Sequence, residues 1–158
     1  MIDEIDPAPF CRRIIRTAAR AMLATTATKG KSGVGGPWPY ASLVLTACDG
    51  QGNPLLLISD LADHTRNIRA DARVALLYDE TAGLDDPLTG ARVTLQGEAE
   101  QVDDAGLMDI YLSRHPTAES YAEFKDFHLF RVRPLRAHLV AGFGRIHWVS
   151  ASDLLEAN

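Results

Sequence analysis

The strict alternation of polar and apolar residues from Arg92 to Glu100 constrains the fold more than any other feature of the sequence. A period of two is typical of a half-buried antiparallel strand, with one face on a core and one face toward solvent. Residues 127–133 and 137–141 continue the pattern as an alternating pair on either side of Pro134. The sequence therefore predicts an antiparallel sheet.

Further strands are predicted from Leu23 onward, at 40–48, at 55–58 and at 74–78. The turn residues 49–54 join the second and third of these as a hairpin, which predicts that the two lie side by side. Helical spacing and caps indicate helices at about 7–22, 63–70 and 103–115. Because strands and helices do not alternate as βαβ units, we expect an α+β antiparallel barrel with helices packed outside it.

The length and composition limit the class of protein. With 158 residues, we expect one domain over 1–158: a helix at about 7–22, the barrel at about 23–149 and a tail helix at about 151–157. A net charge of -5 argues against nucleic acid as a partner. There is no apolar run long enough to span a membrane and no signal peptide, so we expect a cytoplasmic protein. Cys11 and Cys48 have no metal or redox spacing and are interpreted as reduced thiols.

The segment 55–67 combines a buried strand with a chemically capable helix start. Four apolar residues run into Ser59 and Asp60, and His64, Thr65 and Arg66 follow where a helix begins. Free backbone amides and the positive end of the helix dipole favour an anion such as a phosphate there. The alternative is an ordinary helix capped by Asp63.

Common catalytic signatures are absent from the sequence. GxSxG, HExxH and Rossmann glycine patterns do not occur, and the five histidines lack zinc-site spacing, so no metal site is predicted. His128 and His138 are interpreted as structural residues of alternating strands. Trp38, in a loop rich in glycine and proline, is a candidate lid or interface anchor. Arg145 and His147 follow a Gly-Phe-Gly turn and are candidates for contact with a ligand.

Three segments together resemble a known family. Pro39–Val44, Leu57–Ile68 and Gly90–Glu100 are similar, in order and spacing, to the pyridoxamine 5'-phosphate oxidase-like FMN-binding split barrels. Lys125–Phe127 and Gly142–Trp148 resemble the haem-utilisation, HugZ-type branch, so the similarity covers about residues 9–149. The resemblance implies a split barrel of six to seven strands that forms a homodimer with FMN at the interface.

The resemblance also implies cofactor contacts. Ser59 matches a strand-end hydroxyl that contacts the flavin, and His64, Thr65 and Arg66 fall in the family's phosphate segment. Arg92 occupies the position of a glutamine that faces the flavin in the oxidases. Neighbouring polar residues complete the predicted FMN-binding set: Ser42, Asp60 and Thr94.

Departures from the oxidases leave the activity open. Positions that carry an arginine and a lysine in the vitamin oxidases hold Ala41 and Thr46, which argues against pyridoxamine phosphate oxidation. The leading prediction is an FMN-dependent oxidoreductase of unknown small substrate. One alternative is haem binding or degradation of the HugZ type, with contacts from Arg12, Arg16, Arg145, His147 and Trp38. A second is a flavin-binding sensor without catalysis.

Overall fold

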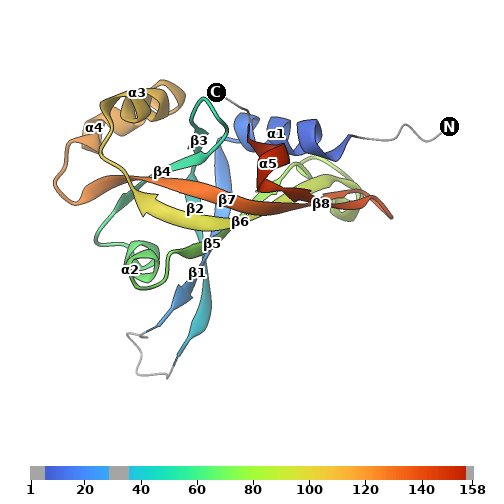
Figure 1. The fold of residues 1–158 in the computed structure, drawn as a ribbon, viewed down its shortest axis with the longest axis horizontal. Coiled ribbons are helices and arrows are strands. Elements are labelled where there is room, and N and C mark those ends of the chain that lie inside the picture. The colour runs from blue at the N-terminus through green and yellow to red at the C-terminus, as the bar shows by residue number, and fades with distance from the viewer. Residues whose placement is uncertain (1–5, 29–35, 156–158) are drawn as a thin grey trace.

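Eight strands form one antiparallel sheet in the described part of the chain, which covers residues 6–28 and 36–155 of a computed structural model. The strand order is β2-β1-β5-β6-β7-β4-β3, with β8 paired to β7, and the sheet curls into a half-open barrel with helices outside it (Figure 1). The predicted antiparallel barrel is therefore confirmed.

The strands are β1 (Arg20–Ala27), β2 (Trp38–Leu45), β3 (Ala47–Cys48), β4 (Pro54–Ser59), β5 (Arg73–Asp79), β6 (Ala91–Gln101), β7 (Phe127–Ala141) and β8 (Ile146–Ser150). The α-helices are α1 (Pro7–Thr17), α2 (Asp63–Ala70), α3 (Ala105–Arg114), α4 (Glu119–Ala122) and α5 (Ala151–Leu154), with 3₁₀ turns η1 (Pro87–Thr89) and η2 (Pro116–Ala118).

Helix α1 is shorter than predicted. It begins as expected, with Asp6 accepting a hydrogen bond from the Ala8 amide and Pro7 at the first helical position. It ends at Thr17, and β1 starts at Arg20 instead of Leu23. Burial along β1 alternates from its first residue, so period two replaces the helical period before position 22. Helix α5 ends at Leu154, and the rest of the predicted tail helix, at 156–158, lies outside the described residues.

The segment 40–48 forms two strands instead of one. Thr46 separates β2 from β3, and its amide donates to the Ala19 carbonyl at 3.0 Å. β2 pairs with β1 over its whole length, and only the two residues of β3 pair with β4. The predicted side-by-side hairpin is therefore right for β3 and wrong for β2.

Two buried clusters hold the barrel and its helices together. Inside the barrel, one row of paired residues crosses five strands and is fully or almost fully buried. The row is Leu23, Leu76, Leu95, Ala137 and Val149. A second cluster lies on the other side of β4, where Leu55 and Leu57 pack with Tyr111 of α3. The split between β2 and β4 lies beside this second cluster.

The long pair β6 and β7 is interrupted by an irregularity at Gln96 and Gly97. A Cβ atom added at Gly97 would lie 2.3 Å from the Arg133 carbonyl oxygen, so only glycine allows this close approach.

Other sequence predictions can be compared with the described residues. Cys11 and Cys48 are free cysteines, and burial raises their thiol pKa values to about 11 and about 12. Both are reduced thiols, as predicted, and both are protonated at neutral pH. Over residues 6–28 and 36–155, none of the helices has the length and apolar character needed to cross a bilayer.

Candidate functional site

Helix α2 begins without a side-chain cap. Ala62 occupies the N-cap position, so the alternative interpretation, a helix capped by Asp63, is wrong. His64 Nδ1 lies 3.1 Å from Ser42 Oγ of β2, which brings two predicted site residues together. His64 Nε2 and the hydroxyl of fully buried Thr65 have no hydrogen-bond partner among the described residues. Buried polar atoms are normally paired, so this helix start has capacity for a ligand.

The His64 side chain is held in its uncharged form. Burial is the main cause that lowers its pKa below the usual 6.5, and the nearby Asp63 carboxylate opposes this effect only in part. At neutral pH the ring therefore offers one donor and one acceptor nitrogen and carries no positive charge.

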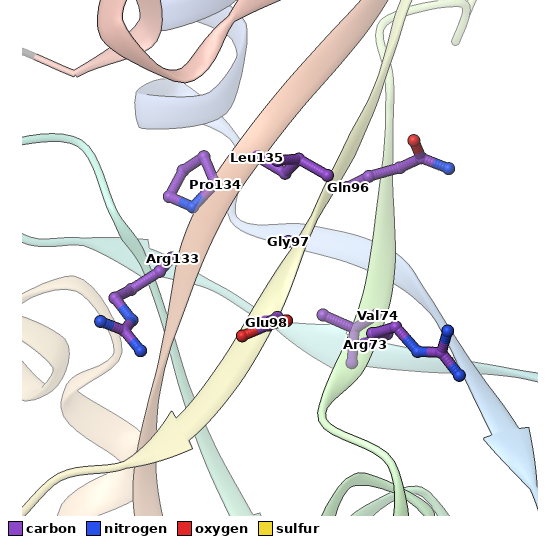
Figure 2. A pocket seen from close by; sticks show the side chains of 8 residues that line it. All are labelled: Arg73, Val74, Gln96, Gly97, Glu98, Arg133, Pro134 and Leu135. Carbon is purple, nitrogen blue, oxygen red and sulfur yellow. The ribbon is translucent and has the colours of Figure 1, made fainter.

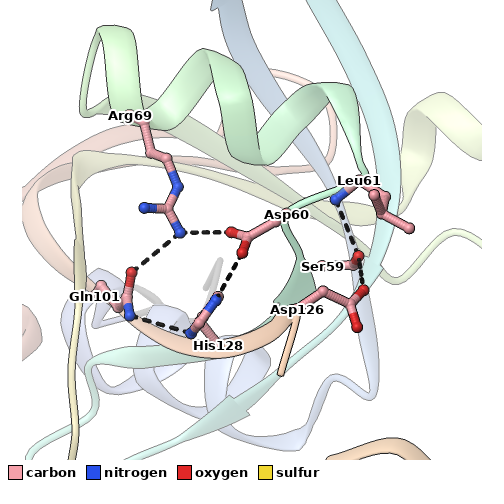
Figure 3. Close-up of polar contacts among 7 residues, drawn as sticks. All are labelled: Ser59, Asp60, Leu61, Arg69, Gln101, Asp126 and His128. Atoms are coloured by element: carbon pink, nitrogen blue, oxygen red, sulfur yellow. Dashed lines mark hydrogen bonds and ion pairs between the residues drawn. The ribbon is translucent and has the colours of Figure 1, made fainter. Parts of the chain in front are cut away.

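Ser59 and Asp60, predicted as cofactor contacts, already have protein partners (Figure 3). Ser59 Oγ donates to Asp126 at 2.6 Å and accepts from the Leu61 amide at 3.1 Å. Asp60 accepts from Arg69 at 2.6 Å and from His128 Nε2 at 2.9 Å. These contacts fix the turn between β4 and α2.

The contacts of Asp60 belong to a closed ring of four side chains. Gln101 Nε2 lies 3.2 Å from His128 Nδ1, and Gln101 Oε1 accepts from Arg69 at 3.2 Å (Figure 3). The ring joins α2 to β6 and β7. His128 is therefore a structural residue, as predicted, and its role is to hold α2 against the sheet.

The other predicted cofactor residues are less well placed for a shared ligand. Arg66 is about half exposed and pairs with Asp63 at 2.8 Å. Arg92 and Thr94 lie near the start of β6, whereas α2 touches β6 at Gln101, which is nine positions after Arg92. An extended strand covers about 30 Å over that length. Arg92 donates instead to the Leu88 and Gly90 carbonyls, at the end of β6 opposite Gln101.

The candidate haem contacts are also dispersed. Trp38 is exposed at the start of β2, whereas Arg145 immediately precedes β8, and these two strands do not pair with each other. Arg12 donates to the Asp153 carbonyl at 2.6 Å, and Arg16 donates to the Gly50 carbonyl at 3.2 Å. His147 pairs with buried Leu139 and therefore lies on the core side of β8.

A feature that sequence reasoning missed crosses the outside of the barrel. Six residues, directly opposite one another in successive strand pairs, form one line across β2, β1, β5, β6, β7 and β8. We call this line the outer row: Leu43, Met22, Leu77, Thr94, His138 and Trp148. Leu43 and Trp148 are each 57% exposed and Met22 is 47% exposed. The period-two pattern of β7 and β8 was the available signal, because it places His138 and Trp148 on the side away from the core.

Aromatic and cationic groups gather at the β8 end of the outer row. The rings of His138 and Trp148 stack with their centroids 4.4 Å apart and an interplanar angle of 27°. The Arg136 guanidinium lies 4.4 Å from the centroid of the same indole and also donates to Gln96 at 2.8 Å. Arg92 and Arg20 lie in the next row of the same face, near Asp79. Three arginines and one aspartate give this face a local positive excess in an acidic protein.

Two hollows adjoin these surfaces. One, of about 520 Å³, lies beside the Gly97 irregularity, and Figure 2 shows Glu98 between Arg73 and Arg133 on its wall. It contains none of the predicted site residues. The other, of about 240 Å³, lies at the split between β2 and β4 and includes Ser59 and His64. Within the described ranges, no group of three or more His, Cys, Asp or Glu residues could hold a metal ion.

Comparison with curated proteins finds haem-related relatives. The chain is 33% identical over 141 residues to the chloroplastic heme oxygenase HOZ of Arabidopsis thaliana, a match that covers 87% of this chain and 41% of the plant protein. It is 28% identical over 137 residues to the heme oxygenase HutZ of Vibrio cholerae, covering 73% of this chain and 77% of that protein. The chain thus spans about two fifths of the length of HOZ.

Solved structures and a family model agree with the fold. A heme binding protein from Mycobacterium smegmatis has a TM-score of 0.83 at 29% identity, over 97% of this chain and 61% of that one. A structure described as a pyridoxamine 5'-phosphate oxidase from Listeria innocua shares the fold at 16% identity and a TM-score of 0.61, over 85% and 98%. The model of the family CREG, beta-barrel matches residues 3–156. The chain shares its fold with the pyridoxamine 5'-phosphate oxidase-like structure, and it belongs to the CREG β-barrel family.

Proposed function

We propose that this protein binds haem, and that the haem lies against the outer row where two copies of the chain meet. The outer row is the observation that carries the proposal. Four of its six residues are exposed apolar or aromatic side chains, with the His138–Trp148 stack at one end and arginines beside it. Names of relatives support the same ligand, because two are heme oxygenases and one is a heme binding protein.

The chemistry of this face suits haem. The macrocycle is flat and apolar, and its two propionates are anionic. Trp148 offers an exposed aromatic surface, and Arg136 supplies a cation for a carboxylate. Arg92, which donates to the Leu88 and Gly90 carbonyls, adds positive charge to the same face. His138 is the imidazole on this face and is our candidate iron ligand, since histidine is a common axial ligand of haem iron. Haem would supply the iron chemistry, and this chain would bind and orient the ring.

FMN, the leading prediction from the sequence, fits the start of α2 less well. A flavin phosphate carries nearly two negative charges at neutral pH. His64 is uncharged there, Arg66 is paired with Asp63, and Asp60 adds a second carboxylate to the same turn. The charge balance of this helix start does not suit a dianion such as the flavin phosphate.

The proposed haem protein is a homodimer, and its predicted cytoplasmic location stays a prediction.

A haemin titration tests the proposal. We expect a Soret band shift that saturates in the wild-type protein, is lost or changed in position in His138→Ala, and needs at least about tenfold more haemin in Trp148→Ala. His147→Ala is the matched control because its side chain lies on the other face of the same strand pair. No Soret shift in the wild type would refute haem binding. A shift altered only in His147→Ala would move the site to the end of the β7–β8 hairpin.

Degradation is a separate question that the same sample answers. The Soret band of the complex is followed after addition of ascorbate in air, with catalase present to remove free peroxide. Loss of the band in the wild type would extend the proposal from binding to oxygenase activity. A stable band would limit it to haem binding.

A further inference from the structure

We propose that the cavity at the split between β2 and β4 binds a small apolar carboxylic acid. This cavity shares Leu43 with the outer row but none of the residues proposed to hold haem, and the proposal does not rest on haem binding. For convenience we call it the split cavity. Its lining is Leu43, Val44, Leu45, Leu57, Ile58, Ser59, Ala62, His64, Tyr111, Tyr121 and Phe127.

The walls of the split cavity favour an apolar ligand body. Most of the lining is aliphatic or aromatic, and the Tyr121 and Phe127 rings pack together with centroids 4.8 Å apart. Burial raises the pKa of Tyr111, so its hydroxyl is uncharged at any physiological pH. The walls therefore carry no charge. A flat ring or a short aliphatic chain fits such a surface.

One end of the split cavity is polar. Ala62 and His64 belong to the start of α2, which has no side-chain cap. His64 Nε2 is shielded from solvent and has no partner among the described residues, although Ser42 holds the other ring nitrogen at 3.1 Å. When the Ser42 hydroxyl donates to Nδ1, Nε2 carries the proton and can donate to a ligand.

Size and charge narrow the ligand class. A volume of about 240 Å³ is below the usual range for drug-sized ligands, so the ligand has a single ring or a short chain. The helix start carries about half a positive charge, and an imidazole N–H adds a donor. Asp60, Asp63 and Asp126 surround the same turn, where Arg66 pairs with Asp63 and Arg69 and His128 pair with Asp60. The carboxylates outnumber the two arginines, so this turn opposes a dianion more strongly than a single negative charge, and a monoanion depends on the helix start and the His64 N–H.

Calorimetric titration with three matched probes tests the proposal: 3-phenylpropionate, the neutral 3-phenylpropanol and the dianionic 3-phenylpropyl phosphate. We expect the acid to bind about tenfold or more tightly than the alcohol, since a hydrogen bond to a charged group is involved. The phosphate should bind more weakly than the acid. In His64→Phe, which keeps a flat ring but removes the nitrogens, the preference for the acid over the alcohol should disappear.

His138→Phe is the matched control, because it makes the same replacement on the outer row. It should keep the preference for the acid, while haemin binding changes, so the two proposals fail independently. If His64→Phe does not fold, Ser42→Ala provides the second variant. It removes the hydroxyl that orients the His64 ring, so the preference for the acid over the alcohol should decrease. Equal affinity for acid and alcohol in the wild type, tighter binding of the phosphate, or no binding of any probe would overturn the proposal.

Discussion

Asp60 links the stability of the protein to acid pH. The hydrogen bond from His128 is the main cause that lowers the pKa of this carboxyl below 3.8, and Arg69 contributes. A group with a lowered pKa stabilises the fold above its unfolded-state pKa, and this contribution is lost as the pH falls through the folded value. We expect Asp60→Asn to be less stable than the wild type at about pH 6, with a difference that shrinks below about pH 3.8.

Urea unfolding at a series of pH values measures this difference. Asp85→Asn, in the loop before η1, is the control and should show no such convergence with the wild type. If the gap between wild type and Asp60→Asn stays constant to the lowest pH, the carboxylate is not the group responsible.

At the residue scale, the sequence located some contacts and could not locate others. It placed His64 at a helix start, and the structure pairs that ring with Ser42, another predicted residue. Asp126, which binds Ser59, is 67 positions away, and no local pattern reveals such a pair. His138 was interpreted as structural because periodicity shows which side of a strand a residue takes but not what packs beside it.

At the scale of elements, the β6–β7 irregularity depends on one glycine. The Arg133 carbonyl oxygen occupies the space that a Cβ at position 97 would need. We expect Gly97→Ala to lower the free energy of unfolding by about 1–3 kcal/mol, measured by urea denaturation. Gly50→Ala is the control, since a Cβ there meets nothing within 4 Å. Equal stability of the two variants would mean that the strands separate locally at little energetic cost.

Element types were easier to predict than element boundaries. The alternation of 92–100 correctly indicated β6, because burial of one face depends only on the local pattern. The boundary between α1 and β1 was missed because Ala18, Ala21 and Met22 continue the helical spacing. Pairing with β2 and β5 decides that boundary, and these partners are distant in sequence.

At the scale of the whole molecule, the outer row predicts dimerisation. An exposed apolar line of this extent is unusual for a monomer. We expect Met22→Glu and Leu77→Glu each to raise the dimer dissociation constant more than about a hundredfold, because each buries an unpaired charge. Sedimentation equilibrium measures the constant. Leu61→Glu is the control, since Leu61 is 73% exposed but lies outside the outer row. A monomeric wild type would contradict the expectation.

The line of the outer row has a consequence for symmetry. In a dimer with a twofold axis through the middle of the row, residues near the axis meet their own copies. Leu77 and Thr94, at the middle, are uncharged and can face themselves, whereas a charge there would face a like charge. Arg20, Arg92 and Arg136 lie in the rows on either side. Trp148 is at the end of the row, so a ligand stacked on it lies off the axis, and such a dimer would carry two.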